Sequence, residues 1–114
     1  MARIIEIRTY ALKAGTSEQF YQLMLEQSVP ALVAAGTDVV AARPSLHSPH
    51  AYLLIRSYSS QVQRSRSQEQ FYCSAAWTNG PRDSIMACLD SYTTVVVEAN
   101  QSTIDGLRTP NKIS

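Results

Sequence analysis

Three segments of the chain alternate their side chains with a period of two residues, and this pattern constrains the fold more than any other feature. The segments run from residue 4 to 12, from 51 to 59 and from 92 to 99. A period of two is that of a β-strand, in which successive side chains point to opposite faces of a sheet. A valine-rich segment from 37 to 46 is interpreted as a further strand, and Pro44 within it favours an edge position.

The segments between these strands carry helical signals. Residues 16–36 place apolar side chains at helical spacing, with Pro30 predicting a kink or break near Ser28 and Gly36 predicting the end. A polar helix is predicted after Ser60 and a short one after Pro81. The order β-α-β-β-α-(α)-β is that of the ferredoxin-like split βαβ plan, an α+β fold. We therefore expect a four-stranded antiparallel sheet in which the first and third strands are central.

Composition limits the number of domains and the partners. With 114 residues, 45% hydrophobic and 17% charged, the chain suits a single domain over residues 1–114, with a core at about 4–99 and a polar, loosely packed C-terminal tail. A net charge of +1 predicts neither nucleic-acid nor membrane binding. The first residues lack an apolar signal segment, and no apolar run approaches about 20 residues, so we expect a cytoplasmic protein.

The two faces of the predicted sheet differ in composition. One face is aliphatic, and we expect the helices to cover this face only; it carries Ile5, Ile7, Leu53, Ile55, Val95 and Val97. The other face is rich in tyrosine and charge, and it carries Glu6, Arg8, Tyr10, Tyr52, Leu54, Arg56, Tyr58, Tyr92, Val96 and Glu98. Left open, its four tyrosines would make an apolar patch larger than soluble monomers usually show. We therefore predict a homodimer in which a second copy packs on this tyrosine-rich face.

Parts of the chain resemble the NIPSNAP family. Residues 5–15, IEIRTYALKAG, are similar to the first strand and turn of that family, and residues 77–83 and 91–98 are similar to its closing segment. The resemblance covers roughly residues 4–99. It implies the dimeric α/β-barrel superfamily, in which two such sheets pair into a barrel, but no defined chemistry. In other branches of that superfamily, small oxygenases, haem enzymes and lactone isomerases use a cleft between sheet and helices.

The charged and tyrosine side chains of one sheet face form the first candidate site, composed of Glu6, Arg8, Tyr10, Arg56 and Tyr58. They are either a buried network that fixes the dimer register or the lining of a cavity for a small organic anion or polar aromatic. The planar fork of arginine suits a carboxylate, and tyrosine offers a ring face and a hydroxyl group. Arg8 and Arg56 are expected to lie close together and to need anions, which Glu6 and Glu98 can supply.

A second candidate cleft lies between the sheet and the helices. It would be lined by Phe20, Met24, Phe71, Tyr72 and Trp77, unless these side chains simply form the core. Combining both sites, the predicted ligand-binding residues are Arg8, Tyr10, Arg56, Tyr58 and Trp77.

Other reactive side chains are interpreted as structural. His47 and His50 lie in a turn with Pro49 and have no partner ligands nearby in the sequence, so we predict no metal, no haem and no other cofactor. Cys73 and Cys88 are interpreted as ordinary thiols. The charged run at residues 64–68 is interpreted as a solvated helix face. Hydrolase, Walker and dinucleotide motifs are absent from the sequence.

Two functions from different classes are compatible with these patterns. The first is a NIPSNAP-like homodimeric protein of undefined chemistry that binds a small organic or aromatic metabolite or acts as an interaction module. The alternative is a small cofactor-independent oxygenase or isomerase of the dimeric α/β-barrel type. Such an enzyme needs a base, and the sequence offers only Glu6, Glu98, His47 and His50, which favours the first function.

Overall fold

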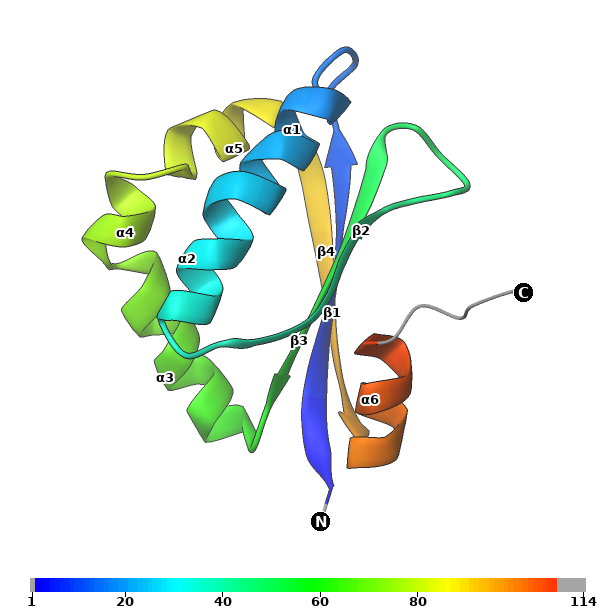
Figure 1. Cartoon of the computed structure of the whole chain (residues 1–114), viewed down its shortest axis with the longest axis vertical. Coiled ribbons are helices and arrows are strands. Elements are labelled where there is room, and N and C mark those ends of the chain that lie inside the picture. Colours follow the sequence, from blue (N-terminus) through cyan, green and yellow to red (C-terminus); the bar gives the residue numbers. More distant parts are fainter. Residues whose placement is uncertain (1, 109–114) are drawn as a thin grey trace.

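The computed structural model describes residues 2–108, which form one four-stranded sheet with helices on both of its faces (Figure 1). The elements in chain order are β1 (Arg3–Leu12), α1 (Ser17–Leu23), η1 (Met24–Ser28), α2 (Val29–Ala34), β2 (Asp38–Pro44), β3 (Ala51–Tyr58), α3 (Gln61–Tyr72), α4 (Ala75–Thr78), α5 (Arg82–Cys88), β4 (Leu89–Ala99) and α6 (Gln101–Arg108). Within residues 2–108, no helix has both the length and the apolar character needed to span a membrane.

The sheet has the strand order β2-β3-β1-β4, and every pairing in it is antiparallel. β1 and β3 are therefore the central strands, as predicted. β2 lies at an edge of the sheet, as Pro44 predicts. Pro44 has no N–H group, and at an edge strand this does not interrupt the hydrogen bonds between the central strands. The α+β class and the split βαβ plan are confirmed.

The first helical region is interrupted where the sequence predicts it, but by a change of helix type rather than by a break. α1 leads into the π-helical segment η1, in which the Val29 N–H bonds to the Met24 carbonyl, five residues back. Pro30 has no N–H group to donate to Glu26, so the regular ladder cannot continue through this point. The region ends at Gly36, whose φ of 90° suits a residue without a side chain.

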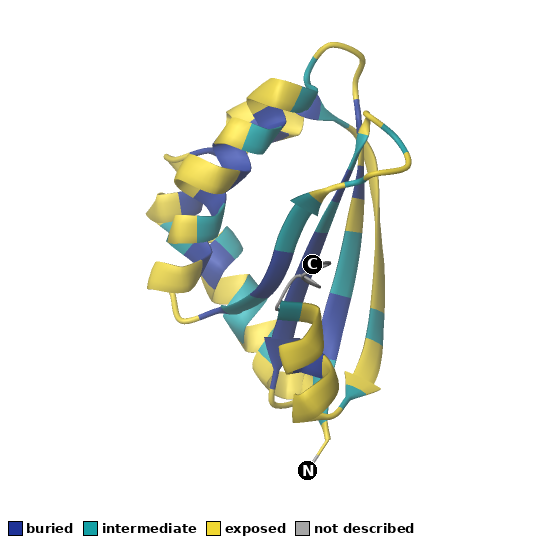
Figure 2. Cartoon of the chain, turned by 45° about the vertical axis from the view of Figure 1, so that its right-hand side comes forward, coloured by how far each residue is buried: buried dark blue, intermediate teal, exposed yellow. Residues whose placement is uncertain are grey.

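Helices α1–α5 cover the tyrosine-rich face of the sheet, whereas the sequence predicted that they cover the aliphatic face (Figures 1 and 2). The division of residues between faces is correct, since Glu6 pairs with Arg56 and Tyr10 with Tyr52 across β1 and β3. The prediction that a second copy covers this face is wrong, because the chain's own helices bury it. The core there includes Tyr10, Phe20, Met24, Tyr52, Leu54 and Phe71.

The aliphatic face carries α6 instead (Figure 1). Ile104 of α6 is fully buried in a cluster with Ile5, Val40, Ala41 and Ile55. The prediction that all helices lie on one face therefore holds for α1–α5 but not for α6. The prediction of a loosely packed tail is wrong for residues 101–108. The rest of the predicted tail, residues 109–114, lies outside the described residues. Over β4 this face stays uncovered, with Val95 54% and Val97 42% exposed.

The turn between α4 and α5 is closely packed at Gly80. A Cβ atom added there would meet the backbone carbonyl oxygen of Ala76 far inside contact distance. Only a residue without a side chain fits, so Gly80 fixes how closely the chain folds back between these two helices.

Candidate ligand-binding site

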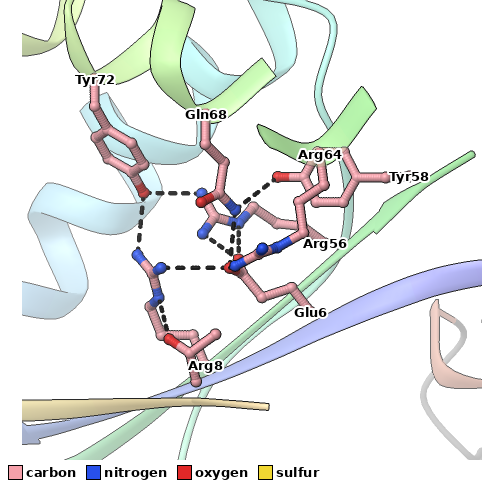
Figure 3. Close-up of polar contacts among 8 residues, drawn as sticks. Glu6, Arg8, Arg56, Tyr58, Arg64, Gln68 and Tyr72 are labelled. Atoms are coloured by element: carbon pink, nitrogen blue, oxygen red, sulfur yellow. Dashed lines mark hydrogen bonds and ion pairs between the residues drawn. The ribbon is translucent and has the colours of Figure 1, made fainter. Parts of the chain in front are cut away.

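A network of polar side chains lies between the sheet and α3, with the carboxylate of Glu6 at its centre (Figure 3). Glu6 is fully buried. Its Oε1 accepts hydrogen bonds from Nε of Arg56, at 2.8 Å, and from Nη2 of the same residue. Its Oε2 accepts from Nη2 of Arg64 at 2.6 Å, from Nε2 of Gln68 at 2.8 Å and from Nη2 of Arg8 at 3.4 Å.

Helix α3 supplies this network because three of its polar residues share one stripe. Arg64, Gln68 and Tyr72 are spaced four residues apart, which places them on the same helix face. That face meets the charged face of the sheet, so the three side chains are half-buried and bond to the buried Glu6 and Arg56. The interpretation of residues 64–68 as a solvated face is therefore wrong for Arg64 and Gln68, while Arg66 between them is exposed.

The charges around Glu6 keep it ionised. Burial alone would raise the pKa of this carboxyl group, but Arg56, the hydrogen bonds from Gln68 and Arg64, and Arg8 together lower it from 4.5 to about 2. The prediction that Glu6 neutralises buried arginine is thus confirmed. The same prediction for Glu98 is wrong, because Glu98 is exposed and forms no ion pair within residues 2–108.

Tyr72 joins the network to the open space beside it. Its hydroxyl oxygen accepts hydrogen bonds from Nη1 of Arg8 at 3.2 Å and from Nη1 of Arg56 at 2.8 Å (Figure 3). On the far side of the network, the Tyr58 hydroxyl accepts from Gln68 at 3.3 Å. Sequence reasoning named Tyr72 only as a possible cleft residue and missed this role, which the four-residue spacing from Arg64 and Gln68 indicates.

A cleft of about 330 Å³ lies next to this network, between the sheet and helices α3–α5. β1 and β4 provide its floor, and the three helices provide its walls. The lining residues are Arg8, Tyr10, Gln68, Tyr72, Trp77, Arg82, Ile85, Met86, Leu89 and Tyr92. Tyr92 and Met86 are 53% and 46% exposed, so the cleft opens to solvent along its β4–α5 rim.

Aromatic rings and the guanidinium group of Arg8 meet inside the cleft, and Arg82 is the second arginine of its lining. The guanidinium carbon of Arg8 lies 4.9 Å from the centre of the Tyr92 ring, within the range of a cation–π contact. Trp77 is held edge to face against Tyr72, with 5.2 Å between ring centres. Burial and the neighbouring Tyr72 raise the pKa of Tyr10 to about 12, so its phenol stays neutral at physiological pH.

The five predicted site residues fall into two groups. Arg8, Tyr10 and Trp77 line the cleft together, although they come from distant parts of the sequence. Arg56 and Tyr58 are buried in the polar network behind it and do not belong to the lining. Of the second predicted cleft, Tyr72 and Trp77 line the cavity, whereas Phe20, Met24 and Phe71 belong to the core.

The remaining reactive residues do not line the cleft. His47 and His50 are exposed in the loop between β2 and β3. Among the described residues, no three potential metal ligands of the histidine, cysteine or carboxylate type form a group. Cys73 is exposed and Cys88 is buried, and both are free thiols.

The sheet order and the helical layer define a ferredoxin-like α+β protein, and solved structures of this class cover most of the chain. A NIPSNAP family protein of Agrobacterium tumefaciens superposes with a TM-score of 0.79 at 13% identity, over 87% of this chain and 94% of that one. A NIPSNAP domain protein of Burkholderia xenovorans gives 0.76 at 14% identity, over 86% and 95%. A candidate antibiotic biosynthesis monooxygenase of Nitrosomonas europaea gives 0.68 at 14%, over 87% and 91%.

At these identities the likeness establishes the fold. The ferredoxin-like chain fold implied by the resemblance to NIPSNAP proteins is therefore confirmed, and the pairing of two sheets into a barrel stays a prediction. No protein-family model matches the sequence, and no curated protein matches it.

Proposed function

We propose that this NIPSNAP-like chain binds a small organic metabolite with an aromatic or apolar body in the cleft between the sheet and helices α3–α5. The observation that carries the proposal is a 330 Å³ cavity with aromatic walls and a guanidinium group at one end. This volume is at the lower end of the range of about 300–1,000 Å³ typical of small-ligand sites. Apolar walls with a few fixed polar groups are also typical of such sites.

Trp77 makes the proposal directly testable. It is the only tryptophan of the chain and it lines the cleft, so its indole N–H resonance reports on the site alone. The probes are benzoate, benzamide, 2-naphthoate and 2-naphthamide. We expect at least one of them to shift this resonance saturably and to raise the melting temperature. If none of the four does so, the proposal fails.

A pair of matched variants separates the cleft from the surface. Tyr92→Leu removes a wall of the cleft at a position that is half exposed, so the fold should tolerate it. Tyr21→Leu makes the same chemical change on α1, outside the lining. We expect Tyr92→Leu to weaken binding about two- to tenfold and Tyr21→Leu to leave it unchanged. Equal effects of the two variants would place the binding site elsewhere.

A small cofactor-independent oxygenase or isomerase is the second candidate, and the fold shared with a candidate antibiotic biosynthesis monooxygenase supports it. Such chemistry requires a group that removes a proton. The lining residues include neither a carboxylate nor a histidine. Glu6, behind them, already accepts hydrogen bonds on both oxygens. The absence of a free base in the lining favours a binding protein over an enzyme. Oxygen consumption on addition of a bound probe would instead favour the oxygenase.

We also propose that the chain forms a homodimer through the part of the aliphatic face that α6 leaves uncovered. Ile7, Leu53, Val95 and Val97 lie on this face, and the two valines are about half exposed. Contiguous apolar patches of this kind mark contact surfaces, and a second copy offers the same patch in return.

We further propose that the protein is cytoplasmic, because free thiols suit a reducing compartment.

Sedimentation velocity at micromolar concentration tests the dimer. Val95→Glu puts a charge in the proposed contact, and we expect it to yield monomers. Val62→Glu makes the same change on the exposed side of α3, where Val62 is 61% exposed, and should leave the dimer intact. A monomeric wild type, or a dimer that persists in Val95→Glu, would disprove this contact.

A further inference from the structure

The polar end of the cleft has more positive than negative charge. Three guanidinium groups, those of Arg8, Arg56 and Arg64, share the single carboxylate of Glu6, which leaves an excess of two positive charges. Within residues 2–108, no other carboxylate lies within ion-pair distance of them. Partly buried charges without partners are costly, so this end of the site favours an anion.

Arg8 holds the least compensated of these charges. Its contact with Glu6 is 3.4 Å, against 2.6 Å for Arg64, although its side chain is only 13% exposed. A guanidinium group has five N–H donors. Arg8 uses three, which donate to Thr94 at 3.2 Å, to Tyr72 at 3.2 Å and to Glu6 at 3.4 Å. Two donors remain, on a group that lines the cleft.

The Tyr72 hydroxyl adds a further donor at the same place. Its oxygen already accepts from Arg8 and Arg56, which occupies its lone pairs. Its own proton has no acceptor among the hydrogen bonds of residues 2–108, and Tyr72 lines the cleft. The hydroxyl group can therefore act on a ligand only as a donor. Arg8 and Tyr72 together present a charged and a neutral donor joined by their own hydrogen bond.

We infer that the ligand of the proposed cleft is an aromatic carboxylate, with one carboxylate oxygen accepting from Arg8 and the other from Tyr72. This inference rests on the proposed function and specifies its ligand class. The adjacent rings of Tyr92 and Trp77 suit a planar body attached to the carboxylate. Glu6 accepts from both Arg8 and Arg56, and both of these donate to the Tyr72 hydroxyl, so the two ligand donors are oriented before the ligand arrives.

The experiment compares acids with their neutral amides by calorimetric titration of the full chain, with the Trp77 indole resonance as the site reporter. We expect benzoate and 2-naphthoate to bind at least about tenfold more tightly than benzamide and 2-naphthamide. Arg8→Met should lower the acid-to-amide ratio at least about threefold, because the charged donor is lost while Glu6 keeps Arg56 and Arg64 in place. Tyr72→Phe should weaken acid binding about three- to tenfold.

Arg66→Met is the matched control, because Arg66 is an exposed arginine of α3 that lies outside the cleft. The acid-to-amide ratio of this variant should equal that of the wild type. Arg8→Lys checks the geometry: it keeps the charge but not the fork, and its ratio should lie between those of wild type and Arg8→Met. Amides that bind as tightly as acids would overturn the inference while leaving the proposed function intact. Displacement of the acids by an equal concentration of inorganic phosphate would also overturn it, because the site would then select charge alone.

Discussion

Glu6 is the residue on which the polar network depends, because it is the shared acceptor of three arginines. Glu6→Gln would leave Arg56, whose side chain is 1% exposed, as a buried charge without a counterion. We expect this substitution to lower the free energy of unfolding by about 3–5 kcal/mol in urea titrations. Glu98→Gln is the control, an exposed glutamate of β4, and should change it by less than about 0.5 kcal/mol. Similar losses for both would contradict the central role of Glu6.

Glu6 also makes the stability of the fold depend on pH. The pKa of Glu6 is about 2 in the fold against an ordinary value of 4.5, so the folded state holds the carboxylate deprotonated. Its stabilising contribution is therefore complete above about pH 4.5 and is lost as the pH falls towards 2. We expect the gap in unfolding free energy between wild type and Glu6→Gln to narrow over this range. A gap that stays constant from pH 6 to pH 3 would show that the ionised carboxylate is not the cause.

At the scale of the element, α6 is a short helix held to the sheet by a few specific contacts. Arg108 donates to both carboxylate oxygens of Asp38, at 2.6 and 3.0 Å, and Arg43 donates to the Leu107 carbonyl at 2.7 Å. Ile104 supplies the buried apolar contact. The charged contacts are partly exposed and contribute little each. The docking of α6 therefore depends mainly on Ile104.

Truncating this side chain tests that conclusion. We expect Ile104→Ala to cost about 2–5 kcal/mol and to speed amide exchange throughout residues 101–108. Leu107→Ala, at a residue that is 36% exposed, should cost less than about 1 kcal/mol. Hydrogen exchange followed by mass spectrometry, together with urea unfolding, measures both effects. Indistinguishable results for the two variants would mean that Ile104 does not anchor the helix.

At the scale of the whole molecule, strand identity, strand order and the division of side chains between faces could be read from the sequence, because a period of two fixes parity. Which face the helices cover could not. Hydrophobicity assigned the aliphatic face to the core, but Glu6 and Arg56 are buried because α3 brings them partners. Val95 and Val97, in contrast, are exposed. A polar helix stripe that matches a polar strand face is the signal that outweighs average hydrophobicity here.

The candidate site was predictable only in part for a related reason. Arg8 and Tyr10 follow from strand parity, and Trp77 was included as a large aromatic near the predicted cleft. Arg56 and Tyr58 share the parity of Arg8, yet they lie behind the cleft, because parity specifies a face and not a position along it. Met86 and Leu89 were missed, because their place in the lining depends on how α5 folds back over β4.

That return of the chain gives Gly80 a significance beyond packing. Arg8 makes one end of the cleft polar, whereas Trp77 of α4 and Met86 of α5, which lie on either side of the Gly80 turn, form part of its walls. In the proposed site, the headgroup of a ligand and its bulk would therefore be recognised by separate parts of the chain. Gly80→Ala must push α4 and α5 apart, so we expect it to weaken binding of 2-naphthoate more than of benzoate, with the acid-to-amide ratio unchanged in calorimetric titrations. Relatives that differ only at this turn would accept acids of different size while keeping the same headgroup.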